Sequence, residues 1–316
     1  MADYLHNHKD FPALLRITGD EKKILPGLIE KDYWIMHTLF GLQKNGFEFE
    51  LKGGTSLSKG YGIIHRFSED IDIHIKPPAN MEINVNPNNT KKGTIETRKA
   101  FYDWLSKNIT IEGIKSAERD TEFDNKKSYL SGGVRLHYTT FTESIDGLKE
   151  GILLEAGFDK VTPNDKVSIS SWAFDKAIES KVEVIDNRAI DIVCYHPGYT
   201  FVEKLQTIAT KFRNEKEDSS ERPNLMRQYY DVHSLLQNQA VQEFIGTDEY
   251  LHHKKNRFPK IDFDIPISEN QAFLLTENGL KDKFKERYQK TAALYYHGQI
   301  PFEDLLSTIH YWLKKL

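Results

Sequence analysis

The stretch that decides the fold is 51-LKGGTSLSKGYGIIHRFSEDIDIHI-75, in which a glycine-rich turn precedes a short strand. Its last six residues, Asp70 to Ile75, alternate polar and apolar side chains. Side chains of a strand point alternately to its two faces, so this pattern predicts a strand with one covered face. The apolar face is formed by isoleucines, and the polar face contains Asp70 and Asp72.

The two aspartates of this strand indicate a metal site. Asp70 and Asp72 are two residues apart, so their carboxylates project from the same face and repel each other. A divalent cation between them relieves that repulsion. Oxygen ligands favour magnesium, which is typically held by one or two carboxylates together with substrate phosphates.

The glycine-rich turn supplies the groups that a phosphate needs. Gly53 and Gly54 allow backbone N–H groups to approach an anion closely, and Thr55 and Ser56 add hydroxyl groups. A phosphate-binding turn followed by metal-binding aspartates is the minimum apparatus for transferring a phosphoryl or nucleotidyl group. Each part alone is more often an ordinary turn or a solvated strand. No Gly-Lys-Ser/Thr follows at the P-loop spacing, and the dinucleotide-binding fingerprint is absent from this stretch.

Gly-Gly-Thr-Ser followed by Arg66-Phe67-Ser68-Glu69-Asp70-Ile71-Asp72 resembles the AbiEii/MenT group of type IV toxin–antitoxin nucleotidyltransferase toxins. This group is a branch of the DNA polymerase beta nucleotidyltransferase superfamily. The resemblance implies a nucleotidyltransferase fold and a third carboxylate on a later strand. Families with a strict Gly-Ser pair have serine directly after glycine, whereas Thr55 intervenes here, so either Thr55 or Ser56 would contact phosphate.

Two residues are candidates for the third carboxylate. Glu155 lies within the apolar run 152–158, where an unpaired acid would be costly to bury. The alternative for Glu155 is an outward-facing strand carboxylate. Asp191, in the alternating segment 190–193, is the weaker candidate. We expect Glu155 to complete the catalytic, metal-binding set with Asp70 and Asp72.

The resemblance extends to segments on both sides of this block. Glu30-Lys31-Asp32-Tyr33-Trp34 is similar to the helix that precedes the turn in the family, and we expect Lys31 to be structural. Later in the chain, the resemblance implies that Lys204 contacts nucleotide phosphates and that Asp231 lies close to it. From the residues alone, Lys204 and Asp231 would be a surface lysine and a helix-face aspartate.

Arg66 and Ser68 are expected to lie next to the residues that bind metal and nucleotide and to help hold them in position. On a continuous strand, Ser68 would share the face of Asp70 and Asp72. Its hydroxyl is expected to hydrogen-bond a carboxylate or phosphate, and self-modification of Ser68 by the enzyme is the alternative.

The positions of turn-forming residues and the periodicity of apolar residues predict an α/β (α+β) chain of two domains. His196-Pro197-Gly198 is the best boundary. Residues 1–196 are expected to form the nucleotidyltransferase-fold domain, with N-terminal helices and a mixed sheet flanked by helices. Residues 197–316 are expected to form a helical domain, because apolar residues recur there at helical spacing.

Composition limits the classes of protein to consider. The 316 residues have a net charge of −4 and a single cysteine, Cys194, so an internal disulfide and a thiolate metal cluster are excluded. No apolar run approaches the ~20 residues that cross a bilayer, and no signal peptide is evident, which predicts a cytoplasmic protein. RNA binding would need a local basic patch, such as 254–257, 281–290 or 314–315.

These features together predict a metal-dependent nucleotidyltransferase with an NTP substrate and Mg²⁺ as cofactor. The enzyme would transfer NMP to an acceptor hydroxyl with release of pyrophosphate. The resemblance further implies that the acceptor is RNA, with tRNA as the expected one, and that translation is blocked. It also implies that a cognate antitoxin is encoded nearby, with a DNA-binding repressor as one form. The alternatives are transfer to a small-molecule hydroxyl and a non-catalytic nucleotide-binding module.

Overall fold

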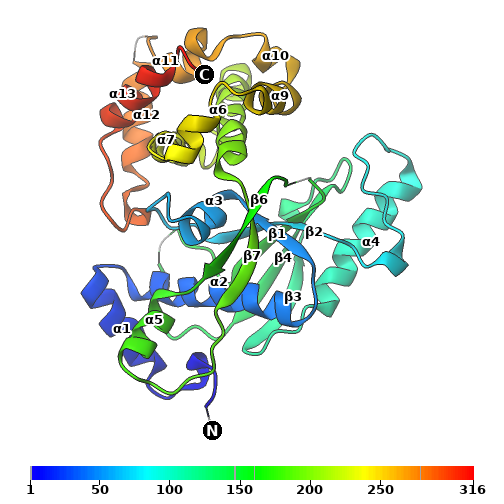
Figure 1. Cartoon of the computed structure of the whole chain (residues 1–316), viewed down its shortest axis with the longest axis vertical. Helices are drawn as coiled ribbons and strands as arrows, with labels where there is room; N and C mark the ends of the chain where they lie inside the picture. Colours follow the sequence, from blue (N-terminus) through cyan, green and yellow to red (C-terminus); the bar gives the residue numbers. More distant parts are fainter. Residues whose placement is uncertain (1, 146, 160, 278) are drawn as a thin grey trace. The chain divides into compact units, whose positions relative to one another are not determined.

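A computed structural model describes residues 2–145, 147–159, 161–277 and 279–316 (Figure 1). The chain divides into two compact units. The sheet unit comprises residues 1–60 and 68–195, and the helical unit comprises residues 61–67 and 196–316. Among the described residues, no helix combines the length and the apolar character needed to span a membrane.

The sheet unit is built on one mixed seven-stranded sheet, which confirms the predicted fold class. The strand order is β3-β4-β5-β2-β1-β7-β6. In chain order the strands are β1 (Phe49–Lys52), β2 (Asp70–Ile75), β3 (Ile114–Asp120), β4 (Ser131–Tyr138), β5 (Ile152–Gly157), β6 (Asn164–Ile169) and β7 (Ala189–Tyr195). The central strand β2 pairs antiparallel with β1 and parallel with β5.

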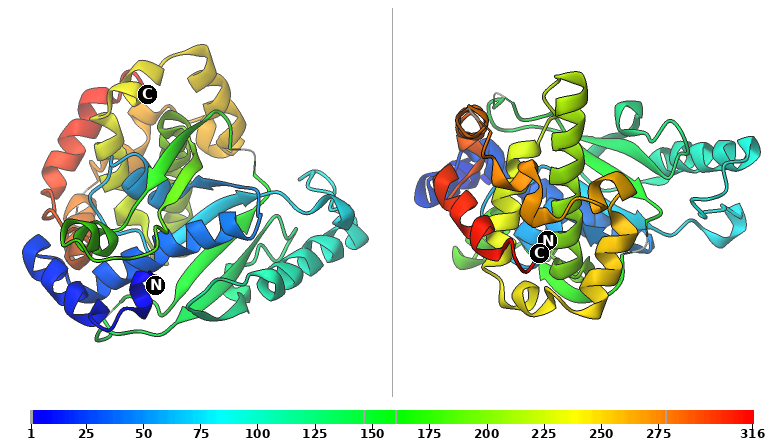
Figure 2. Two further views of the ribbon diagram at one scale, coloured as in Figure 1. Left: turned by 60° about the horizontal axis from the view of Figure 1, so that its bottom comes forward. Right: turned by 90° about the horizontal axis from the view of Figure 1, so that it is seen from above.

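Helices cover the sheet because its strands carry fully buried apolar residues, among them Ile71, Ile73 and Leu154. The helices of the unit are α1 (Phe11–Lys22), α2 (Pro26–Lys44), α4 (Lys92–Asn108) and α5 (Trp172–Glu179). Helix α2 packs against β5 and β7, and α4 packs against β3 and β4 (Figure 2). Helix α2 is buried along almost its whole length, including charged residues in its second turn.

The helical unit contains α6 (Pro197–Asp218), α7 (Leu225–Leu236), α8 (Gln239–Phe244), α9 (Asp248–Arg257), α10 (Lys260–Phe263), α11 (Gln271–Leu274), α12 (Leu280–Gln289) and α13 (Phe302–Trp312). Helix α6 is its longest element and packs against α7, α8 and α9. Apolar residues of α6 at helical spacing, such as Phe201, Leu205 and Ile208, are fully buried.

Residues 61–67 belong to the helical unit although they lie between two elements of the sheet unit. The backbone N–H of His65 donates to the Tyr230 hydroxyl at 3.1 Å. The backbone N–H of Phe67 donates to the Leu294 carbonyl at 2.7 Å. The chain therefore leaves the sheet unit after Gly60 and returns to it at Ser68, directly before β2.

Candidate active site

The glycine-rich turn follows β1 without a break. It consists of a short helical turn, Gly53–Thr55 (labelled α3), and a π-helical turn, Ser56–Gly60. Lys52 is paired with Asp72 across β1 and β2, so the turn begins beside the carboxylate of Asp72. Gly53 has a φ of 72°, and a Cβ there would collide with Oδ2 of Asp72. Both the backbone conformation and the packing therefore require glycine at this position.

The two hydroxyls of the turn bond to its own neighbourhood. The Thr55 hydroxyl donates to the Asp70 carbonyl at 2.5 Å, which ties the turn to β2. The Ser56 hydroxyl donates to the Gly53 carbonyl at 3.0 Å. Both side chains are fully buried. The backbone N–H groups of the turn therefore remain its principal candidates for phosphate binding.

Strand pairing places the predicted carboxylates side by side. Along β2, the isoleucines are fully buried while Asp70 and Asp72 are half-buried, as the alternation predicts. In the parallel pairing of β2 with β5, Asp72 lies opposite Glu155. Glu155 is half-buried between the fully buried Leu154 and Ala156. Asp191 lies on β7, which is separated from β2 by β1, and is exposed.

The electrostatics of this group show an excess of negative charge. Burial raises the pKa of Asp70 to about 6, and the neighbouring Glu69 and Asp72 raise it further. Burial also raises the pKa of Glu155 to about 8, with Asp72 and Asp70 as the next causes. Clustered acids with raised pKa values are typical of functional sites, particularly those completed by a cation.

The residues at this position fit a hard divalent cation. The group offers only carboxylate oxygens, and burial followed by the repulsion between the carboxylates raises the pKa values of Asp70 and Glu155. In the part of the chain that the structure describes, no set of three or more acidic, histidine or cysteine side chains is arranged to hold a metal ion. One or two carboxylates with substrate phosphates are the usual magnesium ligands, so the pair Asp70 and Asp72 is a sufficient protein contribution.

Two lysines beside the carboxylates were not predicted from the sequence. The positive charges of Lys149 and Lys52 both lower the pKa of Glu155, against the stronger effect of burial. Lys52 also pairs with Asp159 at 3.5 Å. Lys52 could have been found from its position directly before the turn, whereas Lys149 lies in a polar connector that carries no recognisable signal.

A second charged group lies in the helical unit and contains three of the predicted residues. The Lys204 Nζ is 3.0 Å from Oδ2 of Asp231. Arg66 donates to both carboxylate oxygens of Asp231, from Nε at 2.6 Å and from Nη2 at 2.7 Å. Asp231 is fully buried, and although burial opposes it, the two cations hold its pKa below the usual range. The structure thus brings Lys204 and Asp231 together and adds Arg66 to them.

Ser68 lies outside the strand. β2 begins at Asp70, so strand periodicity does not extend back to Ser68 and does not set the direction of its hydroxyl. The expectation that Ser68 shares the face of the aspartates therefore loses its geometric basis.

Comparison with known families identifies the chain. The family described as "Nucleotidyl transferase AbiEii toxin, Type IV TA system" matches residues 37–308. The match covers the turn, the paired carboxylates of β2 and β5, and the Lys204–Asp231 pair. No curated protein matches the chain. With its mixed sheet, glycine-rich turn and matched segment of this length, the chain belongs to the AbiEii family of nucleotidyltransferase toxins.

Proposed function

We propose that this protein is a magnesium-dependent enzyme that transfers NMP from an NTP to a hydroxyl of RNA, with tRNA as the favoured acceptor. The observation that carries this proposal is the row of Asp70, Asp72 and Glu155 on adjacent strands, beside a turn that requires glycine. Family membership supports the nucleotidyltransferase activity and a cognate antitoxin. The metal, the RNA acceptor, the block of translation and the cytoplasmic location belong to the proposal.

Each group of the sheet unit has a role in this reaction. Asp70 and Asp72 would hold Mg²⁺, which supplies charge neutralisation at the triphosphate. The backbone N–H groups of residues 53–56 bind phosphate oxygens. Glu155 would orient the acceptor hydroxyl and accept its proton from its position opposite Asp72. The acceptor oxygen forms a bond to the α-phosphorus as the bond to pyrophosphate breaks.

Lys204 is the proposed phosphate ligand of the helical unit. Its ammonium group is held by the buried carboxylate of Asp231, while 13% of its side chain stays exposed. Because Arg66 already binds both oxygens of Asp231, the charge of Lys204 is incompletely neutralised there. A lysine fixed in this way presents a point charge to a triphosphate.

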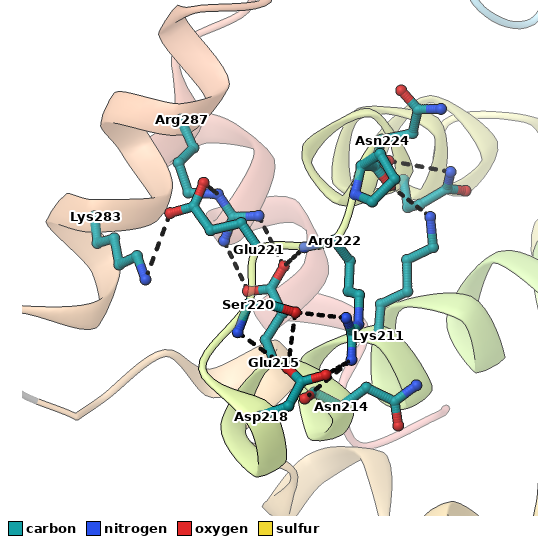
Figure 3. A network of polar contacts seen from close by, with 12 residues as sticks. Lys211, Asn214, Glu215, Asp218, Ser220, Glu221, Arg222, Asn224, Lys283 and Arg287 are labelled. Carbon is teal, nitrogen blue, oxygen red and sulfur yellow. Dashed lines mark hydrogen bonds and ion pairs between the residues drawn. The ribbon is translucent and has the colours of Figure 1, made fainter.

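A basic cavity of the helical unit supports RNA as acceptor. The cavity is about 360 Å³ in volume and lies where the loop before α7 meets α12. Its charged lining consists of one acid, Glu221, and the four cations Arg222, Arg227, Arg287 and Lys290. Figure 3 shows Arg222 and Arg287 within a network of acids. Glu215 accepts hydrogen bonds from the Arg287 guanidinium at 2.8 Å and from the backbone N–H of Arg222 at 2.6 Å, and Asp218 accepts from the Arg222 guanidinium. An ordered basic surface suits the phosphate backbone of RNA despite the net charge of −4.

The proposal is tested by incubating the purified protein with each NTP in turn, labelled at the α-phosphate, with Mg²⁺ and total RNA. We expect label in RNA of tRNA size with one or a few of the NTPs, and no label after addition of a chelator. Label that appears only on small molecules from a cell extract would instead establish the small-molecule reaction. Nucleotide binding without any transfer would contradict the proposal and favour the alternative of a non-catalytic nucleotide-binding module.

A further inference from the structure

Three consecutive charged residues of α2 are buried. Glu30, Lys31 and Asp32 are each 1% exposed. Successive helix residues point about 100° apart, so three in a row cannot share the single stripe that a helix normally buries. A buried charge is costly unless it is paired and hydrogen-bonded. The contacts of the three residues therefore show what each one holds.

Asp32 holds the far end of the glycine-rich turn. Its Oδ1 is 2.7 Å from the Nζ of Lys59, the penultimate residue of Ser56–Gly60. Its Oδ2 accepts the backbone N–H of Trp172 at 2.8 Å, and Lys59 also lies over the Trp172 ring, with Nζ 5.0 Å from the ring centroid. The position of the turn is thus fixed by α2 through the Asp32–Lys59 pair.

Lys31 holds the start of the aspartate strand. Its Nζ donates to the Lys149 carbonyl at 2.6 Å and lies 3.5 Å from Oε2 of Glu69, the residue directly before Asp70. The same oxygen of Glu69 accepts the backbone N–H of Lys149 at 3.2 Å. Lys31 therefore links the residue that precedes β2 to the connector that precedes β5. These are the two strands that carry the carboxylates.

Glu30 holds a segment without any predicted site residue. Its two oxygens accept the backbone N–H of Phe141 at 2.8 Å and the hydroxyl of Thr142 at 2.5 Å. Glu30 therefore provides an internal comparison in the same helix and at the same burial as Asp32.

We infer that Lys31 and Asp32 are positioning residues of the active site, Asp32 for the phosphate-binding turn and Lys31 for the carboxylate strands, whereas Glu30 serves stability alone. The inference rests on the proposed function for its catalytic consequences. It goes beyond the expectation that Lys31 is structural, and it concerns residues that precede the segment matched by the family.

The test compares Lys31→Met, Asp32→Asn and Glu30→Gln, which remove one charge each with little change in volume. Removing groups that orient metal and phosphate ligands typically costs about 10- to 100-fold in affinity or activity. We expect Asp32→Asn to raise the KM for NTP by about 10-fold or more, and Lys31→Met to lower kcat by a similar factor. Glu30→Gln should retain both constants while lowering the melting temperature, because the amide cannot accept both bonds as the carboxylate does.

Lys59→Met provides a second route to the turn if Asp32→Asn fails to fold, because Lys59 is the less buried partner of that pair. It should reproduce the rise in KM, and the double variant Asp32→Asn/Lys59→Met should show no further rise. Equal losses of activity in all three α2 variants, in proportion to their losses of stability, would overturn the inference.

Hydrogen exchange of the free protein separates this inference from the proposed function. Asp32→Asn should speed exchange in peptides that cover residues 53–60, Lys31→Met in peptides that cover 69–72, and Glu30→Gln in neither. If the wild-type protein transfers no nucleotide but this pattern appears, the proposed function fails and the positioning stands. Faster exchange spread evenly over α2 and the sheet in all three variants would overturn the positioning.

Discussion

The ion-pair group of Arg66, Lys204 and Asp231 combines two roles, stabilisation of the helical unit and the proposed binding of phosphate by Lys204. Replacement of Asp231 by Asn, compared with replacement of Lys204, separates them. The substitution keeps the shape of the side chain but removes the negative charge that pairs with both Arg66 and Lys204. Both cations then remain in place, with side chains that are 5% and 13% exposed, without the carboxylate that they share. Arg66 also fixes residues 61–67, which lead directly to the aspartate strand.

The expected magnitude follows from the burial of the group. Breaking a buried ion pair by removing one partner costs about 3–5 kcal/mol, because the remaining charge is uncompensated. Lys204→Met should cost only about 1 kcal/mol, since Asp231 keeps both hydrogen bonds from Arg66. For a unit of this size, the Asp231→Asn cost corresponds to a fall in melting temperature of roughly 10 °C or more.

Calorimetry and nucleotide binding, measured on the same samples, test this reasoning. Asp231→Asn should lower the thermal transition of the helical unit strongly, and Lys204→Met should lower it little while weakening NTP binding by about 10-fold or more. Lys204→Arg should restore binding only in part, because a planar fork does not replace a point charge. Equal destabilisation by Asp231→Asn and Lys204→Met, with unchanged NTP affinity, would refute a phosphate role for Lys204.

Four further predictions follow from individual contacts. Gly53→Ala should abolish transfer, because a Cβ there collides with Asp72 and the φ of 72° is strained for alanine; Gly62→Ala, at a φ of 64° in open space, is the matched control and should remain active. Burial lowers the pKa of His37 to about 4, so its neutral form is favoured in the folded state. The contribution of His37 to the free energy of unfolding should be fully present above pH 6.5 and should fall by up to about 3 kcal/mol as the pH drops from 6.5 to 4. Urea titrations of His37→Gln should therefore show a shallower loss of stability over this pH range. Lys290→Glu, in the basic cavity, should weaken RNA binding and reduce its salt dependence, whereas Lys260→Glu, on α10, should not; equal effects would mean that the cavity has no special part in RNA binding. Expression of the wild type should slow growth and Asp72→Ala should relieve it, and equal inhibition by both would separate toxicity from this chemistry.

The alternation of β2 was sufficient to predict the shared face of Asp70 and Asp72. The same pattern did not locate the start of the strand. Ser68 and Glu69 are polar residues that could belong to a strand or to a loop, and in the structure the strand begins after them, at Asp70. Register with β5 depends on the order of strands in the sheet, which periodicity does not determine. The position of Glu155 opposite Asp72 was therefore reached through the family resemblance and not through spacing.

Other features had no local signal at all. Residues 61–67 contain one glycine, the aromatic residues Tyr61 and Phe67, and an apolar pair, a composition that does not reveal their packing in the helical unit. The partners of Lys31 and Asp32 are distant in sequence: Lys59, Glu69, Lys149 and Trp172. A buried charge can be recognised from sequence only when its partner is known, and long-range partners are set by the tertiary fold.

The central claim is that the carboxylates of β2 support transfer of a nucleotidyl group. The most direct measurement incubates the protein, Mg²⁺ and RNA with the preferred NTP, labelled in one reaction at the α-phosphate and in another at the γ-phosphate. The account predicts that RNA acquires the α-label and not the γ-label, and that Asp72→Ala loses the reaction while melting at or near the wild-type temperature. Transfer of the γ-label, or near-full α-label transfer by Asp72→Ala, would contradict it.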